Sequence, residues 1–196
     1  MDYTDDPNAI PINEEEIKEH CEKQYKAQKC LQKYAEDCLE GISKEAIKTY
    51  SSGIEEGLNM RCNNDGELHA DFLEHGPCLR EIFVKRYHCL TRLITRMYDV
   101  QNGGVPKEQS VNTACCSWLE FGRCSLNLTE TSCGDKAANF IRRKAKVYTQ
   151  KMVDLICKDT SPDTCRNMEK PKFLISPFVP FVNILNEQVN QDGTKS

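Results

Sequence analysis

The chain has 196 residues, of which 39% are hydrophobic and 29% charged, with twelve cysteines and a formal net charge of −4. This length suits one domain or two small lobes, and no stretch approaches the roughly 20 apolar residues that span a bilayer. The mild acidic excess argues against general nucleic-acid binding, which needs a basic surface.

The first predicted elements form a helical hairpin. Residues 14–38 contain no Gly or Pro and are rich in Glu, Lys, Gln and Ala, which favour helix. We expect Gly41 to end this helix and Ser43 to cap the next one, whose apolar face consists of Ile47, Tyr50, Ile54 and Leu58. Gly53 and Gly57 are four residues apart, so another helix backbone is expected to approach closely there.

The rest of the first half is predicted to be a connector and a third helix. The connector, residues 62–77, contains the turn signal Asn63-Asn64-Asp65-Gly66. The third helix is expected from about Leu79 to Tyr98, followed by the Gly- and Pro-containing linker 101–112.

The second half is predicted to repeat the hairpin. A helix is expected over 113–133, then a turn at Gly134-Asp135, then a returning helix over 137–155. The cysteine spacing supports a repeat, because three pairs of cysteines are each 95 residues apart: Cys21 and Cys116, Cys38 and Cys133, and Cys62 and Cys157.

The number and spread of the cysteines indicate structural disulfides. The count is even, and no C-x-x-C pair, which zinc and thioredoxin-like sites usually need, occurs. We expect all twelve to be bonded, in an oxidising compartment: Cys21, Cys30, Cys38, Cys62, Cys78, Cys89, Cys115, Cys116, Cys124, Cys133, Cys157 and Cys165.

Hairpin geometry suggests some of the pairs. Cys21 lies about 20 residues before the first turn and Cys62 about 21 after it, so a Cys21–Cys62 bond is predicted, and by the repeat Cys116–Cys157. Cys30–Cys89 and Cys38–Cys78 are a guess among the 15 ways of pairing six cysteines. Partners for Cys115, Cys124, Cys133 and Cys165 are left open.

Two further features bear on secretion. Asn127-Leu128-Thr129 is an N-glycosylation sequon, which supports an extracellular location together with the cysteines. Residues 1–16 have no apolar signal segment, so we expect a mature chain behind an added Met, with a cytosolic protein of odd composition as the alternative.

The sequence therefore predicts an all-α, disulfide-stapled helical bundle with two pseudo-repeated hairpin lobes. The predicted parts are a tail (1–13), a first lobe (14–100), a linker (101–112), a second lobe (113–168) and an apolar, Pro-containing segment with a flexible tail (169–196). Within it, the apolar stretch 173–185 is interpreted as docking on the chain's own core, or else as a mobile lid or partner-binding segment. Its contact residues are Phe173, Leu174, Ile175, Phe178 and Phe181.

No pattern of catalytic residues emerges, so no enzyme activity, cofactor or metal is predicted. The sequence lacks G-x-S-x-G and a Gly-rich phosphate loop. His69 and His75 flank Asp71 and Glu74, but their six-residue spacing does not place both imidazoles on one helix face. The basic run Arg142-Arg143-Lys144 is interpreted as a solvated face rather than a phosphate site.

The stretch from Cys62 to Cys89 resembles the arthropod hemolymph glycoprotein family, a group of secreted cysteine-rich helical proteins. The resemblance rests on Cys62-Asn63-Asn64-Asp65-Gly66, Phe72, Gly76-Pro77-Cys78 and His88-Cys89. The later Ala114-Cys115-Cys116-Ser117-Trp118 and the cysteines after it are similar to arachnid and crustacean members. The resemblance covers about residues 20–165. It implies an all-helical disulfide fold and an extracellular life, and it carries over no catalytic residue.

The leading functional hypothesis is a secreted, non-catalytic carrier of a lipid or another apolar ligand in body fluid. The alternative is an extracellular interaction or structural component of matrix, silk, saliva or venom, with self-association or a protein partner. An inhibitor or toxin ranks last, because no reactive-loop signature is present. Neither nucleic acid nor a transmembrane segment is expected.

Overall fold

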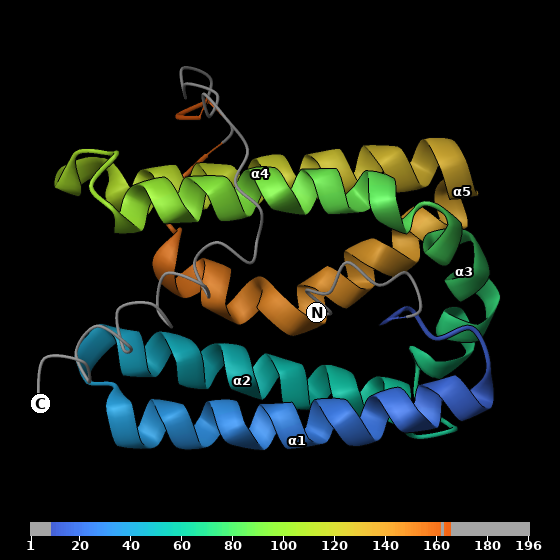
Figure 1. Cartoon of the computed structure of the whole chain (residues 1–196). Helices are drawn as coiled ribbons and strands as arrows, with labels where there is room; N and C mark the ends of the chain where they lie inside the picture. The colour runs from blue at the N-terminus through green and yellow to red at the C-terminus, as the bar shows by residue number, and fades with distance from the viewer. Residues whose placement is uncertain (1–8, 162, 166–196) are drawn as a thin grey trace, which may run out of the picture. The chain divides into compact units, whose positions relative to one another are not determined.

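The computed structural model of the chain describes residues 9–161 and 163–165, and across these residues the fold is all-α (Figure 1). The helices are α1 (Glu14–Cys38), α2 (Gly41–Cys62), α3 (His69–Glu81), α4 (Phe83–Gln101) and α5 (Ser110–Ile156), with the 3-10 turn η2 (Lys107–Gln109) before α5. Among the described residues, every helix is too short or too polar to cross a bilayer. The predicted all-α, disulfide-rich fold class is confirmed.

Contacts along the chain define two compact units. The first is Met1–Arg86 with Cys124–Asp159, and the second is Tyr87–Arg123 with Thr160–Ser196. Both α4 and α5 therefore contribute residues to both units. This grouping differs from the predicted lobes, because Cys124–Asp159 belongs with the first half of the chain.

The start of α1 is fixed by local hydrogen bonds. The Asn13 side chain accepts a hydrogen bond of 2.9 Å from the Glu16 N–H, and the Glu16 carboxylate accepts one of 3.1 Å from the Ile12 N–H. These reciprocal bonds satisfy N–H groups that an unprotected helix start would leave free. Three glutamates in the first turn also stabilise the helix, because their negative charges lie at the positive end of the helix dipole.

The hairpin α1–α2 lies side by side in Figure 1, as predicted, but α2 begins earlier than predicted. Gly41 is the first residue of α2 and has φ of +56°, with Glu40 at the cap position. The predicted cap at Ser43 is wrong, because Gly41 adopts the left-handed conformation that turns the chain directly into α2.

The core of the first unit joins α1, α3 and the last part of α5. Ile17 and Cys21 come from α1, and Phe72 and Leu79 from α3. The Phe72 ring meets the fully buried Phe140 ring edge to face, with centroids 4.9 Å apart, a favoured aromatic geometry.

Two glycines of α2 allow α5 to pack against it at backbone distance. A Cβ atom built on Gly53 would lie 2.6 Å from the Tyr148 carbonyl oxygen, and one on Gly57 would lie 2.1 Å from the Tyr148 ring. A larger residue at Gly53 would require the α5 backbone to shift, and one at Gly57 would require the Tyr148 ring to shift. The predicted close approach of a helix backbone is confirmed, and the helix is α5.

Two predicted boundaries differ from the structure, and a third is confirmed. The predicted connector contains α3, which runs through Pro77. The single predicted helix from Leu79 to Tyr98 is divided at Ile82, where ψ of 5° departs from helical geometry. Gly134, with φ of 83°, interrupts α5, so the break predicted between two helices at Gly134-Asp135 is confirmed.

Candidate functional site

Disulfides hold the described helices together. Ten cysteines are bonded. Cys21–Cys62 spans the open end of the α1–α2 hairpin with Cα atoms 5.9 Å apart, so that predicted pair is confirmed. Cys78–Cys133 also has a Cα separation of 5.9 Å and joins α3 to α5. This bond connects the two predicted lobes, which the predicted pairs did not.

The prediction that all twelve cysteines are bonded is wrong. Cys30 and Cys38 are free thiols on the exposed face of α1. The guessed pairs Cys38–Cys78 and Cys30–Cys89 are therefore incorrect. The physical reason is orientation, because Cys30 and Cys38 face solvent while Cys89 is 4% exposed.

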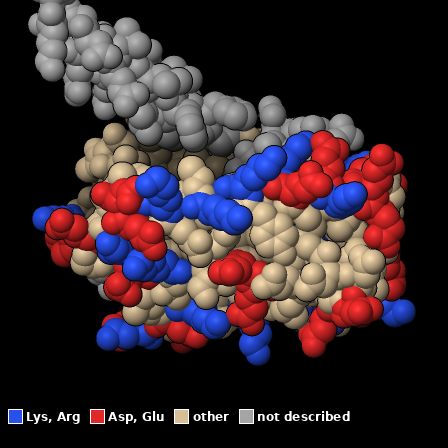
Figure 2. All heavy atoms as spheres, turned by 90° about the horizontal axis from the view of Figure 1, so that it is seen from below, with Lys and Arg blue, Asp and Glu red and all other residues tan. Residues whose placement is uncertain are grey.

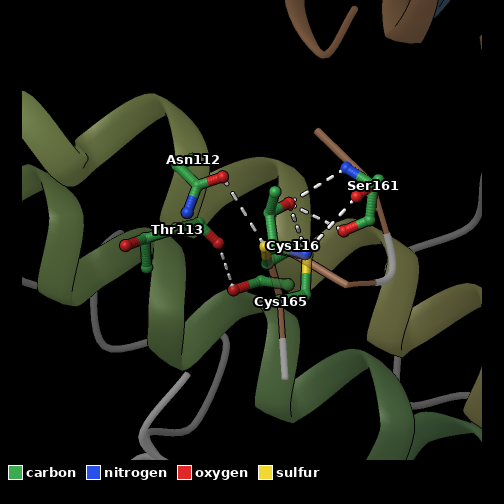
Figure 3. The surroundings of a disulfide bond; sticks show 7 residues. Asn112, Thr113, Cys116, Ser161 and Cys165 are labelled. Carbon is green, nitrogen blue, oxygen red and sulfur yellow. Dashed lines mark hydrogen bonds between the residues drawn. A yellow bond between two sulfur atoms is a disulfide. The ribbon is translucent and has the colours of Figure 1, made fainter. Parts of the chain in front are cut away.

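The predicted Cys116–Cys157 bond is replaced by Cys116–Cys165, with Cα atoms 5.3 Å apart. Figure 3 shows Cys165 beside Cys116 and next to the turn that contains Ser161. The Ser161 N–H donates to the Thr164 hydroxyl at 3.0 Å, and that hydroxyl donates to the Ser161 carbonyl at 2.7 Å. This turn directs the chain after α5 toward Cys116, which sequence spacing alone does not reveal.

A groove in the first unit is the candidate ligand site. Its volume is about 370 Å³. The apolar part of its lining is Ile17, Tyr25 and the Cys21–Cys62 disulfide. The polar part is supplied by Glu14, Lys18, Glu22, Asn63, Asn64 and His69. Pockets that bind small molecules combine an apolar lining with a few polar groups in this way.

His69 connects the groove to two neighbouring segments. Its Nδ1 lies 2.8 Å from the Arg61 carbonyl oxygen, and its Nε2 lies 2.9 Å from a Glu14 carboxylate oxygen. Both partners only accept hydrogen bonds, so both ring nitrogens carry a proton when both bonds are made. Burial disfavours this charge, but the bonds to Arg61 and Glu14 outweigh it and raise the pKa of His69 above its ordinary 6.5.

The raised pKa of His69 predicts a dependence of stability on pH. The folded protein holds the His69 proton more tightly than the unfolded chain does. Protonated His69 therefore stabilises the fold fully below its ordinary pKa of 6.5, and this contribution is lost as the pH rises through the pKa of His69 in the folded protein. Replacing His69 by Gln is expected to remove this loss. Denaturant unfolding at about pH 5 and about pH 8 measures it.

The control for this prediction is His88→Gln, since His88 is exposed on α4. That variant is expected to keep the wild-type loss of stability at the higher pH. A His69→Gln protein with the same pH dependence as the wild type would contradict the assigned role of His69.

A second ion pair holds the chain entering α1. Arg80 of α3 donates to the Glu16 carboxylate and, through Nε, to the Ile10 carbonyl oxygen at 2.9 Å. Burial of Glu16 opposes its charge, but the hydrogen bonds from Arg80 and the Ile12 N–H prevail and lower its pKa. These contacts fix the position of Glu14 at the groove.

His75, the histidine that the sequence analysis paired with His69, does not line the groove. His75 stacks at a tilt on Phe140, with centroids 5.7 Å apart, while Asp71 is paired with Arg143 at 2.6 Å. Within the described part of the chain, three or more His, Cys, Asp or Glu residues do not gather as they would around a metal ion.

The remaining predicted site residues are the glycosylation site Asn127 and five apolar contact residues. Asn127 is exposed on α5, whereas the sequon hydroxyl of Thr129 is buried and donates to the Ser125 carbonyl at 2.8 Å. The proposed apolar contacts lie outside the described residues: Phe173, Leu174, Ile175, Phe178 and Phe181.

Sequence reasoning did not identify the groove. Glu14 and His69 are 55 residues apart, and neither belongs to a motif. The only available signal was the predicted Cys21–Cys62 bond, which brings the start of α1 to the end of α2. The residues on either side of that bond could have been considered together.

The fold and the groove define an all-α, disulfide-rich protein with an open, partly apolar groove beside one disulfide. The family described as "Protein of unknown function (DUF1397)" matches residues 9–142, which is more than half of the chain, and the protein belongs to this family. No curated protein and no solved structure matches the chain.

Proposed function

We propose that the protein is a secreted, non-catalytic carrier of a small lipid or another apolar ligand in extracellular fluid. The observation that carries this proposal is the groove lined by Ile17, Tyr25 and the Cys21–Cys62 disulfide. Its volume of about 370 Å³ lies within the range of roughly 300–1,000 Å³ usual for small-molecule sites.

The chemistry of the groove fits a ligand with an apolar body and a polar end. Apolar atoms of the ligand would leave water against Tyr25 and the disulfide, which contributes roughly 25 cal/mol for each Å² removed from water. Lys18 supplies an ammonium group and Asn63 and Asn64 supply amides at the same groove. These groups can hydrogen-bond the polar end.

An extracellular location is supported by the cysteines. Ten of them are disulfide-bonded, and bonds in such numbers are typical of oxidising compartments. Membership of the arthropod hemolymph glycoprotein group and glycosylation at Asn127 belong to the same proposal. The exposed side chain of Asn127 leaves space for a glycan on α5.

The alternative proposal is an extracellular interaction or structural component. The observation that favours it is the pair of exposed free thiols, Cys30 and Cys38, on α1. This role needs a contact surface but no groove, so ligand titration separates the two proposals.

The carrier proposal predicts saturable binding of a fluorescent fatty acid to the delipidated protein. Asn64→Trp places an indole at the groove, because Asn64 is exposed and lines it. The larger side chain is expected to weaken binding by at least tenfold, or about 1.4 kcal/mol. Titration by fluorescence gives the dissociation constants.

The matched control is Asn139→Trp, the same exchange at an exposed position of α5 that does not line the groove. It is expected to bind like the wild type. Absence of saturable binding would remove the carrier proposal, and equal weakening by both variants would place the ligand outside this groove.

A further inference from the structure

Cys30 and Cys38 have no partner within the chain. Of the twelve cysteines, they are the two free ones, and the other ten are bonded to one another. Nor can they bond to each other while α1 is intact. Eight residues of helix separate their Cα atoms by about 12 Å, whereas a disulfide tolerates at most about 7 Å. Any disulfide at either thiol must therefore involve another molecule.

The two thiols belong to one exposed row on α1. Cys30, Tyr34 and Cys38 follow each other at steps of four, which places them along one side of the helix. Tyr34 is 51% exposed, and the exposed Ala27 extends the row. We call these four residues the α1 stripe. It lies on a different side of α1 from the buried residues Ile17, Cys21, Gln28 and Ala35.

The two thiols of the stripe are placed symmetrically about Tyr34, which stands four residues from each of them. If a second α1 lies antiparallel across Tyr34, Cys30 of each copy comes level with Cys38 of the other. Rows of residues four apart are also the ridges that run parallel in the commonest class of helix packing. A twofold contact of this kind uses the same surface on both copies.

We propose that the α1 stripe is the surface on which a second copy of this chain docks, with the two α1 helices antiparallel and joined by two Cys30–Cys38 disulfides between the copies. The occupant is a second copy because both thiols of one chain find a partner in the same register, which a single free thiol on another protein would not provide.

The charges beside the stripe suit this register. Lys33 and Asp37 form an exposed ion pair of 2.5 Å on one flank of the stripe. In the antiparallel arrangement, Asp37 of one copy lies within two residues, or about 3 Å of helix rise, of Lys33 on the other. Figure 2, seen from the side on which α1 is drawn in Figure 1, shows charges of both signs interspersed with uncharged surface. Such a surface avoids the repulsion of a single-sign patch.

The bonds form by thiol–disulfide exchange with a small-molecule disulfide as oxidant. The Cys30 thiolate attacks one sulfur of that disulfide, forming a mixed disulfide and expelling one small thiolate. The Cys38 thiolate of the second copy then attacks the Cys30 sulfur and expels the second small thiolate. Each new bond oxidises two protein thiols, reduces one small disulfide, and leaves the two protons on the two released thiols.

Oxidised glutathione added to the native full-length protein tests the proposal. A covalent dimer of twice 22.4 kDa is expected on a non-reducing gel, and it should return to monomer with reductant. Trypsin cleaves after Lys29, Lys33 and Lys44, so Cys30 and Cys38 fall on different peptides. Mass spectrometry of the dimer band is expected to find these two peptides joined.

Single serine variants define the register. Cys30→Ser alone and Cys38→Ser alone should each remain monomeric, because neither retains both halves of the bond. A mixture of the two should form a covalent dimer through the one remaining Cys38–Cys30 pair. The double variant Cys30→Ser/Cys38→Ser is the control and should form no dimer with either single variant.

Three results would overturn the proposal. Glutathione-capped monomer as the sole product would show that the copies do not meet at the stripe. A covalent dimer of either single variant alone, through Cys30–Cys30 or Cys38–Cys38, would exclude the antiparallel register. An undiminished rate of dimer formation in Tyr34→Lys, which places two cations at the centre of the contact, would exclude docking through Tyr34.

Discussion

Replacing Cys21 and Cys62 together by alanine is expected to lower the free energy of unfolding by about 4 kcal/mol, the chain-entropy value for a loop of this length. The bond joins residues 41 apart in sequence at the open end of the α1–α2 hairpin. Without it the unfolded chain gains the freedom that the crosslink removes. The same exchange removes part of the apolar lining of the groove, so fatty-acid binding should weaken as well. Urea unfolding gives the free energies.

The chain offers a matched control for that exchange. Replacing Cys30 and Cys38 by alanine also removes two sulfur atoms, but these cysteines are exposed and free, so the monomer should keep the wild-type free energy of unfolding within about 0.5 kcal/mol. Equal losses in both double variants would show that Cys21–Cys62 does not constrain the chain.

Gly53→Ala is expected to destabilise the protein by about 2 kcal/mol, although alanine is the better helix former. The added Cβ would lie 2.6 Å from the Tyr148 carbonyl oxygen and 3.0 Å from that of Val147. These are backbone atoms of a helix, so relief requires α5 to move away from α2. Overpacking of this kind costs roughly 1–3 kcal/mol. Thermal and urea unfolding measure the change.

Gly122→Ala provides the comparison. Gly122 also lies in a helix, α5, but a Cβ built on it has no heavy atom within 4 Å. Alanine at position 122 should therefore stabilise the protein by up to about 1 kcal/mol, because its helix propensity is higher than that of glycine. If both glycine variants stabilise the protein, the close packing of α2 against Tyr148 is incorrect.

Much of the helical structure follows from local sequence. The bounds of α1 match the predicted 14–38 segment, because helix-forming residues without Gly or Pro extend up to a clear stop. Gly134 interrupts α5 where the sequence predicts a break. Local patterns were less reliable at Pro77, which α3 accommodates, and at Ser43, where the preceding Gly41 already starts α2.

The groove needed information that local patterns lack. His69 and Glu14 meet because α3 and the start of α1 pack around Ile17 and Phe72 in one core. No local sequence pattern around either residue predicts the contact. Predicting the site would have required the positions of α1, α2 and α3 relative to one another within the first unit.

The sequence by itself determined the all-α class, the disulfide-rich character, the Cys21–Cys62 bond and the small-residue face at Gly53, since each depends on composition or on spacing within one hairpin. Only the tertiary structure decided that Cys78 bonds Cys133 and Cys116 bonds Cys165, and that Cys30 and Cys38 stay free. The physical reason is that a disulfide requires Cα atoms within about 7 Å, and distances between segments far apart in sequence are set by packing.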